Sequence, residues 1–305
     1  MLQVERLHQR AILMGSLRSF FVCRGFLEVD TPIRQPLLIP ERYIEPLRSE
    51  DAYLQTSPEL CMKRLLAHGC SKIFQICACF RKNEQGQRHL EEFTMLEWYH
   101  SGESYLKLMD DCEGLLRFVK RQLSHCVEEQ GVSDTSFAGF DFEGPWERLT
   151  VATAFLKYSP YSVTEAIESD RFDEILVEYV EPQLGQKTPT FLMDYPLELG
   201  SLARSKIDKP KLVERFELYL GGVELANGFS ELTDEAEQRS RFEEEIIDIE
   251  KTWGSNIQMP ERFLEDIGKI KSAAGIALGV DRLFMLGLGI EDIGDAVSFS
   301  PVDLT

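Results

Sequence analysis

Three glutamates stand seven residues apart near the end of the sequence, at Glu217, Glu224 and Glu231. The segment 215–227, RFELYLGGVELAN, predicts a β-hairpin around its two glycines, which places Glu217 and Glu224 diagonally on one face. Carboxylates at that separation repel, so a divalent cation between them is one interpretation and a solvated outer face is the other. The odd step to Glu231 requires a β-bulge, for which Gly228 is the predicted place.

A strand with little side-chain bulk is predicted over 273–280, AAGIALGV. Gly275, Ala277 and Gly279 share one of its faces, where a flat ligand can lie against the backbone; tight packing of another element is the alternative. Arg282 follows at the start of a short predicted helix, and both the helix start and the guanidinium favour an anion there.

Charged side chains also occur on two predicted strands, 73–81 (IFQICACFR) and 93–99 (FTMLEWY). Because side chains alternate along a strand, Glu97 shares a face with the ring of Phe93, while Arg81 ends the preceding strand. Charged side chains on half-buried strands are costly unless they form an ion pair or bind a ligand. An internal Arg81–Glu97 ion pair and ligand binding are therefore two alternative explanations for these charges. The 11-residue charged segment between the strands is too long for a plain hairpin turn and is typical of a functional loop.

Together, these predicted faces supply an aromatic ring, several arginines, a carboxylate pair and further carboxylates. An aromatic ring stacks on a base, arginine attracts phosphate, Mg²⁺ bridges carboxylates and phosphates, and the remaining carboxylates bind a cation. The set therefore predicts a site for a nucleoside triphosphate and a positively charged small molecule. It suits neither hydride transfer nor thiol chemistry.

The elements that must hold these residues predict an α+β fold in which helices flank an antiparallel sheet. An amphipathic helix is predicted over 7–21, followed by a strand, FLEVDTPI. Ser57 is the predicted N-cap of a helix that has Pro58 at its first position, has Glu59 in its first turn and ends near Gly69. Further helices are predicted near 103–130, 147–157, 170–182 and 233–253.

Composition excludes several classes of protein. The 305 residues are 43% hydrophobic and 28% charged, as in a globular chain, and no linker divides them, so we expect one domain over 1–305. The 52 acidic and 33 basic residues give a net charge of −19, which disfavours broad nucleic-acid binding. Seven cysteines, all within the first 126 residues, indicate a reducing, cytoplasmic setting rather than a disulfide framework. We expect neither export nor a membrane span, because no long apolar run occurs.

Three segments resemble the signature motifs of the class II aminoacyl-tRNA synthetases, in the right order: GFLEVDTPI, FRKNEQGQRHLEEFTMLEWY and GIALGVDR. Within that family the similarity is to the lysyl enzymes, through TSPE, EFTMLEW, RFELYLGGVELANGFSEL and GVDRL, and it spans nearly the whole sequence. The lysyl enzymes carry an N-terminal anticodon-binding barrel, whereas this sequence opens at the helix before the first motif. A stand-alone catalytic domain of this kind resembles the lysyl-synthetase paralogues that attach β-lysine to a lysine of elongation factor P.

The resemblance implies a two-step reaction that uses ATP and Mg²⁺. The carboxylate of (R)-β-lysine, or of lysine, would attack the α-phosphorus in line to form an aminoacyl-adenylate. A lysine amine of elongation factor P would then take the acyl group and release AMP. The resemblance also implies a homodimer with Pro32 at its interface. The acidic charge agrees with a protein acceptor, and tRNA is not an expected partner.

Particular residues are implied for each subsite. Arg81 and Arg282 are the expected catalytic residues, with Arg81 at the α-phosphate and Arg282 opposite Phe93 around adenine. The ATP-binding set is Arg81, Asn83, Arg88, His89, Phe93, Glu224, Leu225, Gly279 and Arg282. The substrate-binding set is Ser57, Pro58, Glu59, Glu97, Tyr99, Asn227, Glu231 and Ala277. The expected Mg²⁺ ligands are Glu217 and Glu224.

The sequence departs from the family pattern at three places. Asn83 stands where the second motif usually has glutamate, with Glu84 next to it, so both are candidates for the adenine amino group. Leu90 and Glu91 replace the usual Asn-Pro. Ala277 stands where lysyl-tRNA synthetases have glycine, and one methyl group in a pocket floor changes discrimination by roughly 1–3 kcal/mol. That difference fits the shifted amino group of β-lysine.

Four alternatives stay open from the sequence alone. Two are enzymes: a truncated lysyl-tRNA synthetase that charges tRNA, and another ligase that forms aminoacyl-adenylates. A catalytically inactive regulatory paralogue is the third, and the presence of both Arg81 and Arg282 argues against it. The fourth is a zinc-binding module, whose four cysteines lack paired C-x-x-C spacing: Cys61, Cys70, Cys77 and Cys79.

Overall fold

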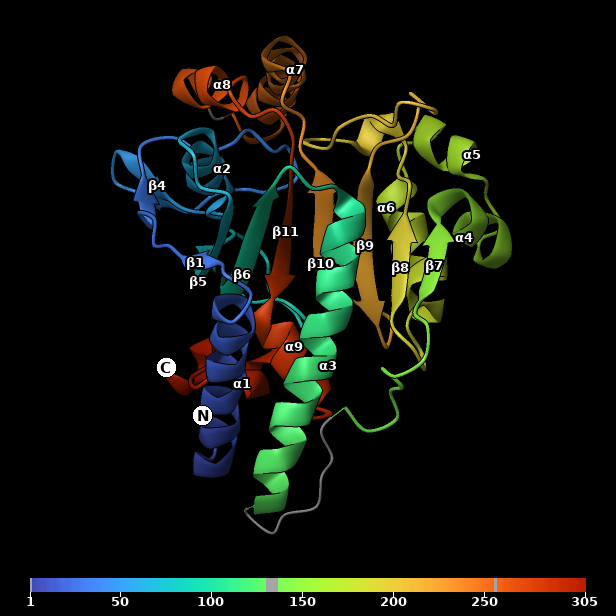
Figure 1. Ribbon diagram of the computed structural model, residues 1–305. Helices are drawn as coiled ribbons and strands as arrows, with labels where there is room; N and C mark the ends of the chain where they lie inside the picture. The colour runs from blue at the N-terminus through green and yellow to red at the C-terminus, as the bar shows by residue number, and fades with distance from the viewer. Residues whose placement is uncertain (1, 130–136, 255–256) are drawn as a thin grey trace.

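An eight-stranded sheet runs through the molecule (Figure 1). The computed structural model describes residues 2–129, 137–254 and 257–305. Across the sheet the strands are β1 (Leu27–Glu28), β5 (Lys72–Phe80), β6 (Glu92–Ser101), β11 (Ala273–Gly279), β10 (Val223–Ser230), β9 (Arg215–Leu220), β8 (Thr190–Met193) and β7 (Glu147–Thr150). The edge pairs β1–β5 and β7–β8 are parallel, and the inner pairs are antiparallel. The predicted α+β fold is confirmed.

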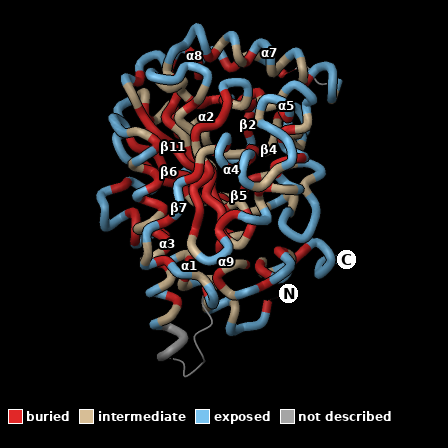
Figure 2. Tube along the Cα trace, turned by 90° about the vertical axis from the view of Figure 1, so that its right-hand side faces the viewer, coloured by how far each residue is buried: buried red, intermediate tan, exposed pale blue. Residues whose placement is uncertain are grey.

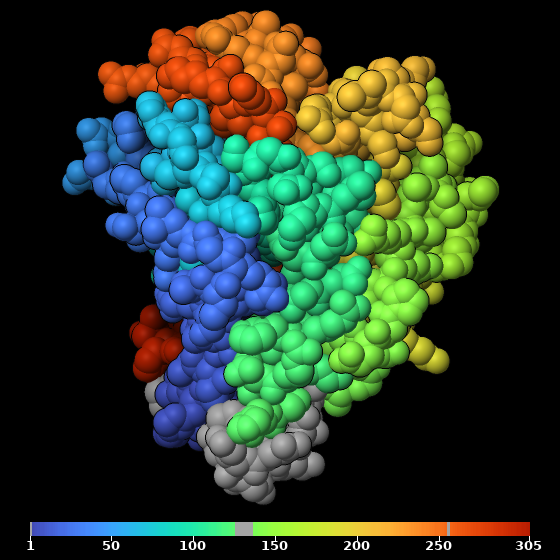
Figure 3. Space-filling model, in the orientation of Figure 1, coloured from blue at the N-terminus to red at the C-terminus, as the bar shows by residue number. Residues whose placement is uncertain are grey.

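Two long helices, α1 (Val4–Val22) and α3 (Tyr105–Glu129), lie side by side over one face of the sheet (Figures 1 and 3). The helix predicted over 7–21 is therefore confirmed. Its buried side includes Leu13, Leu17 and Phe21, whereas Leu7 is 39% exposed.

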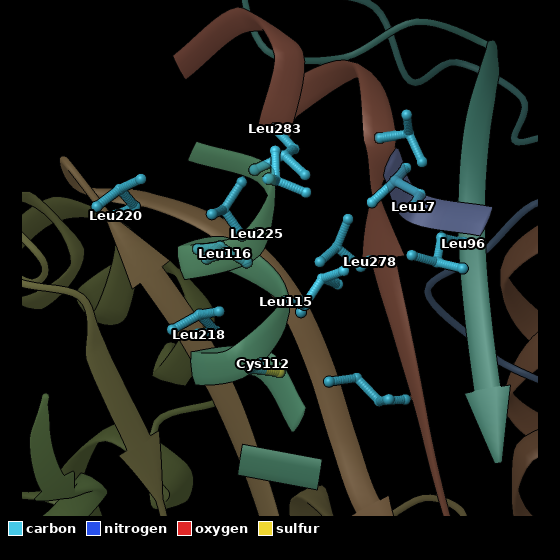
Figure 4. Packing of buried hydrophobic residues seen from close by; sticks show 14 of the residues in the cluster. Leu17, Leu96, Cys112, Leu115, Leu116, Leu218, Leu220, Leu225, Leu278 and Leu283 are labelled. Carbon is cyan, nitrogen blue, oxygen red and sulfur yellow. The ribbon is translucent and has the colours of Figure 1, made fainter. Parts of the chain in front are cut away.

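The main hydrophobic core lies between these helices and the sheet. Leu115 and Leu116 of α3 belong to the same buried cluster as Leu218 of β9, Leu225 of β10 and Leu278 of β11 (Figure 4). Full burial of one leucine side chain contributes about 1.5–3 kcal/mol. This layer stabilises the sheet from one side and leaves its other face available for a site.

The remaining elements surround the sheet. Helices α7 and α8 lie together next to α2, while α4 to α6 lie beside β7 and β8 (Figure 1). Their bounds are α2 (Glu59–Ala67), α4 (Val151–Tyr158), α5 (Val163–Glu168), α6 (Phe172–Ile175), α7 (Glu235–Trp253), α8 (Glu261–Ile267) and α9 (Val280–Gly287). A small second sheet consists of β2 (Arg34–Gln35), β4 (Ala52–Leu54) and β3 (Arg48–Ser49). No helix in the described part of the chain is both long and apolar enough to cross a membrane.

Alternation along β6 separates the core from the site, as predicted. Leu96 and Trp98 are completely buried in the cluster beneath α1 and α3. Phe93, Glu97 and Tyr99 point to the opposite face, where they line a cavity. The strands form the most deeply buried part of the chain (Figure 2), so the charges on them are held in a poorly solvated setting.

The predicted hairpin of β9 and β10 is confirmed. Gly221 and Gly222 form its turn with φ values of 59° and 71°, a left-handed conformation that suits glycine. Glu224 pairs with Tyr219, as expected from a two-residue turn. The bulge, however, lies between Glu224 and Ala226 rather than at Gly228.

Packing explains why Gly228 was the wrong position for the bulge. Gly228 is regularly paired with Phe216 and Ile276, and a Cβ atom there would lie 3.0 Å from the ring of Phe216 and 2.9 Å from Cβ of Ile276. The glycine is required by two neighbouring strands, which the hairpin sequence alone does not reveal.

Three predicted element boundaries also need correction. Helix α2 begins at Glu59 with Pro58 as its N-cap, and the Ser57 hydroxyl accepts the backbone N–H of Glu59 at 3.2 Å. Residues 147–150, predicted as helix, form β7, which pairs with β8 before α4 begins. The strand predicted over FLEVDTPI pairs only at Leu27–Glu28, since β1 is a short edge strand that soon reaches a proline.

Candidate active site

A cavity of about 430 Å³ lies on the sheet face opposite α1 and α3. Its floor comes from β6, β9, β10 and β11, and its walls come from the loop after β5, the 41–44 segment and the start of α2. The site residues predicted from the sequence that line it are Ser57, Glu59, Arg81, Arg88, His89, Phe93, Glu97, Tyr99, Glu217, Glu224, Leu225, Asn227, Ala277, Gly279 and Arg282. Pro58, Asn83 and Glu231 do not line it. Segments far apart in the sequence therefore converge on one cavity.

Arginines gather at one end of the cavity. Arg81 lies over the ring of Phe93, with its Cζ 5.3 Å from the ring centroid, and is 3.6 Å from Glu84. Its Nε is buried and makes no hydrogen bond within the described residues. The Arg81–Glu97 pair considered above is therefore not formed, because Glu97 instead accepts a hydrogen bond from Tyr99. The Arg81 guanidinium retains donors for a ligand.

Arg282 is held by the loop that follows β5. It donates to the carbonyl of Arg88 at 3.2 Å, to the carbonyl of Glu224 at 2.9 Å and to Nε2 of His89 at 2.6 Å. A guanidinium has only donors, so His89 must accept through Nε2 and is neutral. Burial, followed by the charge of Arg282, lowers the pKa of His89, which agrees with that assignment.

Asn83 points away from the cavity. Its φ of 64° is left-handed, its backbone N–H donates to Glu91 at 2.8 Å and its side-chain amide donates to Glu45 at 3.0 Å. Its carbonyl accepts the backbone N–H of Gln85. Glu84 is the residue of this turn that reaches the cavity wall, so the geometry favours Glu84 over Asn83 for a contact with bound nucleotide.

Leu225 reaches the cavity only in part. Its side chain is 2% exposed and belongs to the core cluster, where Figure 4 shows it near Leu116, Leu220 and Leu283. Since the side chain is committed to the core, the backbone at the bulge is the part of Leu225 that can contact a ligand.

Glu217 and Glu224 share the cavity wall, as the hairpin predicted. Oε2 of Glu217 accepts the hydroxyls of Tyr195 at 2.6 Å and Tyr219 at 2.7 Å, while Oε1 accepts Arg215 at 2.7 Å. Oε1 also accepts the side-chain amide of Asn227, but at 3.5 Å, so this is the weakest of the four bonds and the one that a ligand could most easily replace. Burial, and then repulsion from Glu217, raises the pKa of Glu224, whose nearest cation, Arg282, is 3.6 Å away. Each carboxylate thus has one arginine partner, at 2.7 Å for Glu217 and at 3.6 Å for Glu224.

The glycine strand combines both interpretations offered for it. A Cβ atom at Gly275 would lie 2.2 Å from the ring of Tyr99 and 2.5 Å from Oε1 of Glu231, so this glycine is required for packing. A Cβ atom at Gly279 would have Cδ of Arg282 as its nearest neighbour, at 3.6 Å. The floor is therefore closed at Gly275 and open at Gly279.

This contrast gives a matched pair of variants. Gly275→Ala is expected to lower stability by roughly 1–3 kcal/mol, because the methyl group overpacks the site. Gly279→Ala is expected to change stability by less than about 0.5 kcal/mol. Thermal unfolding compares the two directly, and equal melting temperatures would contradict the packing difference.

Carboxylates gather at the other end of the cavity. Glu97 is 1% exposed and accepts the Tyr99 hydroxyl at 2.8 Å. Burial, followed by repulsion from Glu59, raises the pKa of Glu97 well above its ordinary value. Glu231, which is also 1% exposed, lies behind the cavity wall and forms an ion pair with Lys63. An amine-bearing ligand would neutralise this acidic end.

Sequence reasoning missed two charged residues at the acidic end. Lys63 follows Glu59 by four residues on α2, a spacing that favours an ion pair on a helix and was the available signal. Glu41 lies on the cavity wall in a segment without regular structure, where no periodic pattern marks it. Burial, followed by repulsion from Glu59, raises the pKa of Glu41 to about 7.

Whole-chain comparisons agree with this geometry. A family model described as tRNA synthetases class II (D, K and N) matches residues 3–303. A protein of Salmonella gallinarum named elongation factor P–(R)-beta-lysine ligase is 37% identical over 97% of this chain and 95% of its own length. A protein of the same name from Salmonella paratyphi B is 36% identical over the same shares. The chain therefore belongs to the class II tRNA synthetase family (D, K and N), a family of enzymes.

Proposed function

We propose that this protein is an ATP-dependent ligase that activates (R)-β-lysine, or lysine, and transfers it to a lysine side chain of elongation factor P. The observation that carries the proposal is the polarity of one cavity, which has arginines at one end and buried carboxylates at the other. ATP fits the first end and the amines of a diamino acid fit the second. Relatives similar over 97% of the chain carry the name of this activity.

The residues of the arginine end would hold the nucleotide. We assign Arg81 to the α-phosphate, because its guanidinium has a free buried Nε and lies beside Phe93, on which adenine can stack. Arg88 and Arg282 would hold the outer phosphates and the base, and Arg282 is positioned by its bonds to the Arg88 carbonyl and to neutral His89. Alignment of the substrate carboxylate with the α-phosphorus and neutralisation of phosphate charge then account for adenylate formation.

Glu217 and Glu224 are the residues that would hold Mg²⁺. The ion binds through one or two carboxylates together with substrate phosphates, and bound there it would neutralise phosphate charge. The donor set fits: Oε1 of Glu217 holds Asn227 only at 3.5 Å, and Glu224 is joined to Arg282 only by a long contact of 3.6 Å. Tyr195 and Tyr219 would orient Glu217 by their hydrogen bonds.

Transfer needs an amine rather than an ammonium from the acceptor lysine. That amine attacks the acyl carbon of the adenylate, the bond to the phosphate oxygen breaks, and AMP leaves.

We also propose that residues 1–305 form one catalytic domain, that two copies pair through the exposed segment near Pro32, and that the enzyme works in the cytoplasm. The family match over 3–303 and the exposure of Pro32 and Ile33 support these assignments.

Exchange of pyrophosphate into ATP tests the proposed activity. Purified enzyme is expected to catalyse exchange with (R)-β-lysine or lysine, and mass spectrometry is expected to show the matching increase on elongation factor P. Exchange with neither isomer would refute the substrate. Efficient charging of purified tRNA without modification of elongation factor P would instead establish the tRNA ligase alternative.

The magnesium assignment has its own variant. Glu224→Gln is expected to raise the Mg²⁺ concentration needed for half-maximal exchange by roughly tenfold or more, since one charged ligand oxygen is lost. Glu181→Gln is the matched control, because Glu181 is a neighbouring carboxylate that bonds Tyr219 but does not line the cavity. An unchanged Mg²⁺ requirement in Glu224→Gln would contradict the assignment.

A further inference from the structure

A buried lysine lies directly behind the acidic end of the cavity. Lys63 is 2% exposed, and its Nζ is 2.5 Å from Oε1 of Glu59 and 2.5 Å from Oε2 of Glu231. It also lies 5.1 Å from the centroid of the Phe229 ring. One ammonium group thus joins a carboxylate at the start of α2 to a carboxylate just beyond β10.

Glu231 keeps one oxygen for a ligand, and Glu59 reaches the cavity itself. Glu59 lines the cavity while its Oε1 is directed to Lys63. Oε1 of Glu231 is buried and has no hydrogen-bond partner within the described residues. It lies 2.5 Å from the point where a Cβ atom of Gly275 would stand, and Gly275 lines the cavity floor. The unused oxygen of Glu231 therefore points to the strand on which the substrate would lie.

Further acidic groups face the Lys63, Glu59 and Glu231 cluster. Glu97 and Tyr99 face it from β6, and Glu41 faces it from the loop before β3, where Arg81 partly offsets the negative charge. Without a cation, such a group would take up protons and lose its attraction for an amine. Lys63 supplies that cation permanently.

The protonation states agree with this arrangement. Burial alone would lower the pKa of Lys63, but Glu231 and Glu59 raise it above its ordinary value, so the ammonium stays charged. Burial raises the pKa of Glu231 to about 8, although Lys63 opposes that rise. Loss of Lys63 would raise the pKa of Glu231 further.

We propose that Lys63 is a positioning residue for substrate recognition, which pairs with Glu59 and Glu231, fixes their separation and directs the two carboxylates toward the ammonium groups of the substrate. The inference rests on the proposed function, because it takes the substrate to be a diamino acid. Lys63 touches neither ATP nor the reacting carboxylate in this arrangement. Its effect should therefore appear in the KM for the amino acid.

Lys63→Met tests the inference by exchange kinetics. We expect the KM for the amino acid to rise by roughly 10²-fold, the scale observed when one partner of a buried charge pair is truncated. The KM for ATP is expected to stay unchanged. Because the carboxylate pKa rises in the variant, its amino-acid KM should fall more steeply than that of the parent enzyme as pH increases from 7 to 9.

Two further variants separate positioning from a general structural role. Lys63→Arg keeps the charge and is expected to recover most of the lost affinity. Lys206→Met removes another ion-paired, partly buried lysine, which does not line the cavity, and is expected to leave both KM values unchanged. Equal increases of both KM values in Lys63→Met, or an unchanged pH profile, would overturn the inference.

The double variant Lys63→Met/Glu231→Gln covers the case in which Lys63→Met does not fold. It removes both charges of the Lys63–Glu231 pair, and the remaining partner, Glu59, lines the cavity, so the variant should fold. Its amino-acid KM is nevertheless expected to be raised at least as much. A parental KM in the double variant would overturn the inference.

A measurement without substrate separates this inference from the proposed function. Failure of the parent enzyme to exchange with either lysine isomer would refute the function alone. Carboxyl ¹³C titration, with the Glu231 signal assigned from Glu231→Gln, is then decisive. We expect the Glu231 pKa to rise by about one unit or more in Lys63→Met. An unchanged titration would overturn the role of Lys63.

Discussion

Replacement of Arg81 by alanine is expected to reduce adenylate formation by about 10²- to 10³-fold while the protein keeps its fold. Arg81 follows β5 at the arginine end of the cavity, lies over Phe93 and has a buried Nε that meets no partner among the described residues. Preorganised donors aimed at developing phosphate charge act strongly in such a poorly solvated site. The loss should appear in the rate of exchange at saturating lysine and ATP.

The control for this variant removes an arginine that serves only the surface. Arg239 forms ion pairs with Glu235 and Glu261 on helices α7 and α8, away from the cavity. Arg239→Ala is expected to retain full exchange, since exposed pairs contribute only about 0–1 kcal/mol to stability. Comparable activity in the Arg81 and Arg239 variants would remove Arg81 from the reaction.

Local patterns predicted the parts of the site that depend on a single strand or turn. The two adjacent glycines set the β9–β10 register, so the pairing of Tyr219 with Glu224 followed from the sequence. Side chains alternate along a strand, so the sequence also placed Glu97 and Tyr99 on one face of β6. These features need no knowledge of distant segments.

Features that depend on tertiary neighbours were not predictable in this way. The bulge fell beside Glu224 because Gly228 must fit between Phe216 and Ile276, which lie on two different strands. The Lys63–Glu231 pair joins α2 to the end of β10 and has no signal in the sequence. Only the Lys63–Glu59 pair, four residues apart on one helix, could be read from it. Long-range packing decided both outcomes.

The sequence also could not decide whether Asn83 or Glu84 faces the cavity. The left-handed backbone of Asn83 turns its side chain to Glu45 and brings Glu84 to the cavity wall. Asparagine tolerates this conformation, so its presence was permissive, but the motif alone left both residues open. Backbone conformation within the 11-residue loop settled which side chain faces the cavity.

Replacement of Glu97 by glutamine is expected to weaken amino-acid binding and to stabilise the fold at the same time. The carboxylate is 1% exposed, and its hydrogen bond from Tyr99 orients it at the acidic end. Loss of the charge should raise the KM for lysine by roughly 10²-fold, as for a truncated buried charge pair. The KM for ATP, which we assign to the opposite end, should not change.

The stability gain follows from the direction of the pKa shift. Burial, and then repulsion from Glu59, raises the pKa of Glu97 well above its ordinary value. A raised carboxyl pKa favours the folded state below the unfolded-state pKa of about 4.5, and this contribution is lost as pH rises through the folded-state pKa. Above the folded-state pKa, the parent protein holds Glu97 as a buried carboxylate, which lowers the stability of the fold. Glu97→Gln should therefore melt at a higher temperature than the parent at pH 8, with little difference near pH 4.

Asp111 supplies a buried carboxylate with the opposite expectation. Burial would raise its pKa, but hydrogen bonds from His100 and Lys107 lower it below the ordinary value. A lowered pKa stabilises the folded state above the unfolded-state value of about 3.8, and that contribution is lost as pH falls. Asp111→Asn should therefore lower the melting temperature at pH 8 and leave the KM for lysine unchanged. If Glu97→Gln lowered the melting temperature at pH 8, as Asp111→Asn is expected to do, the charge of Glu97 would not be held at a cost to stability.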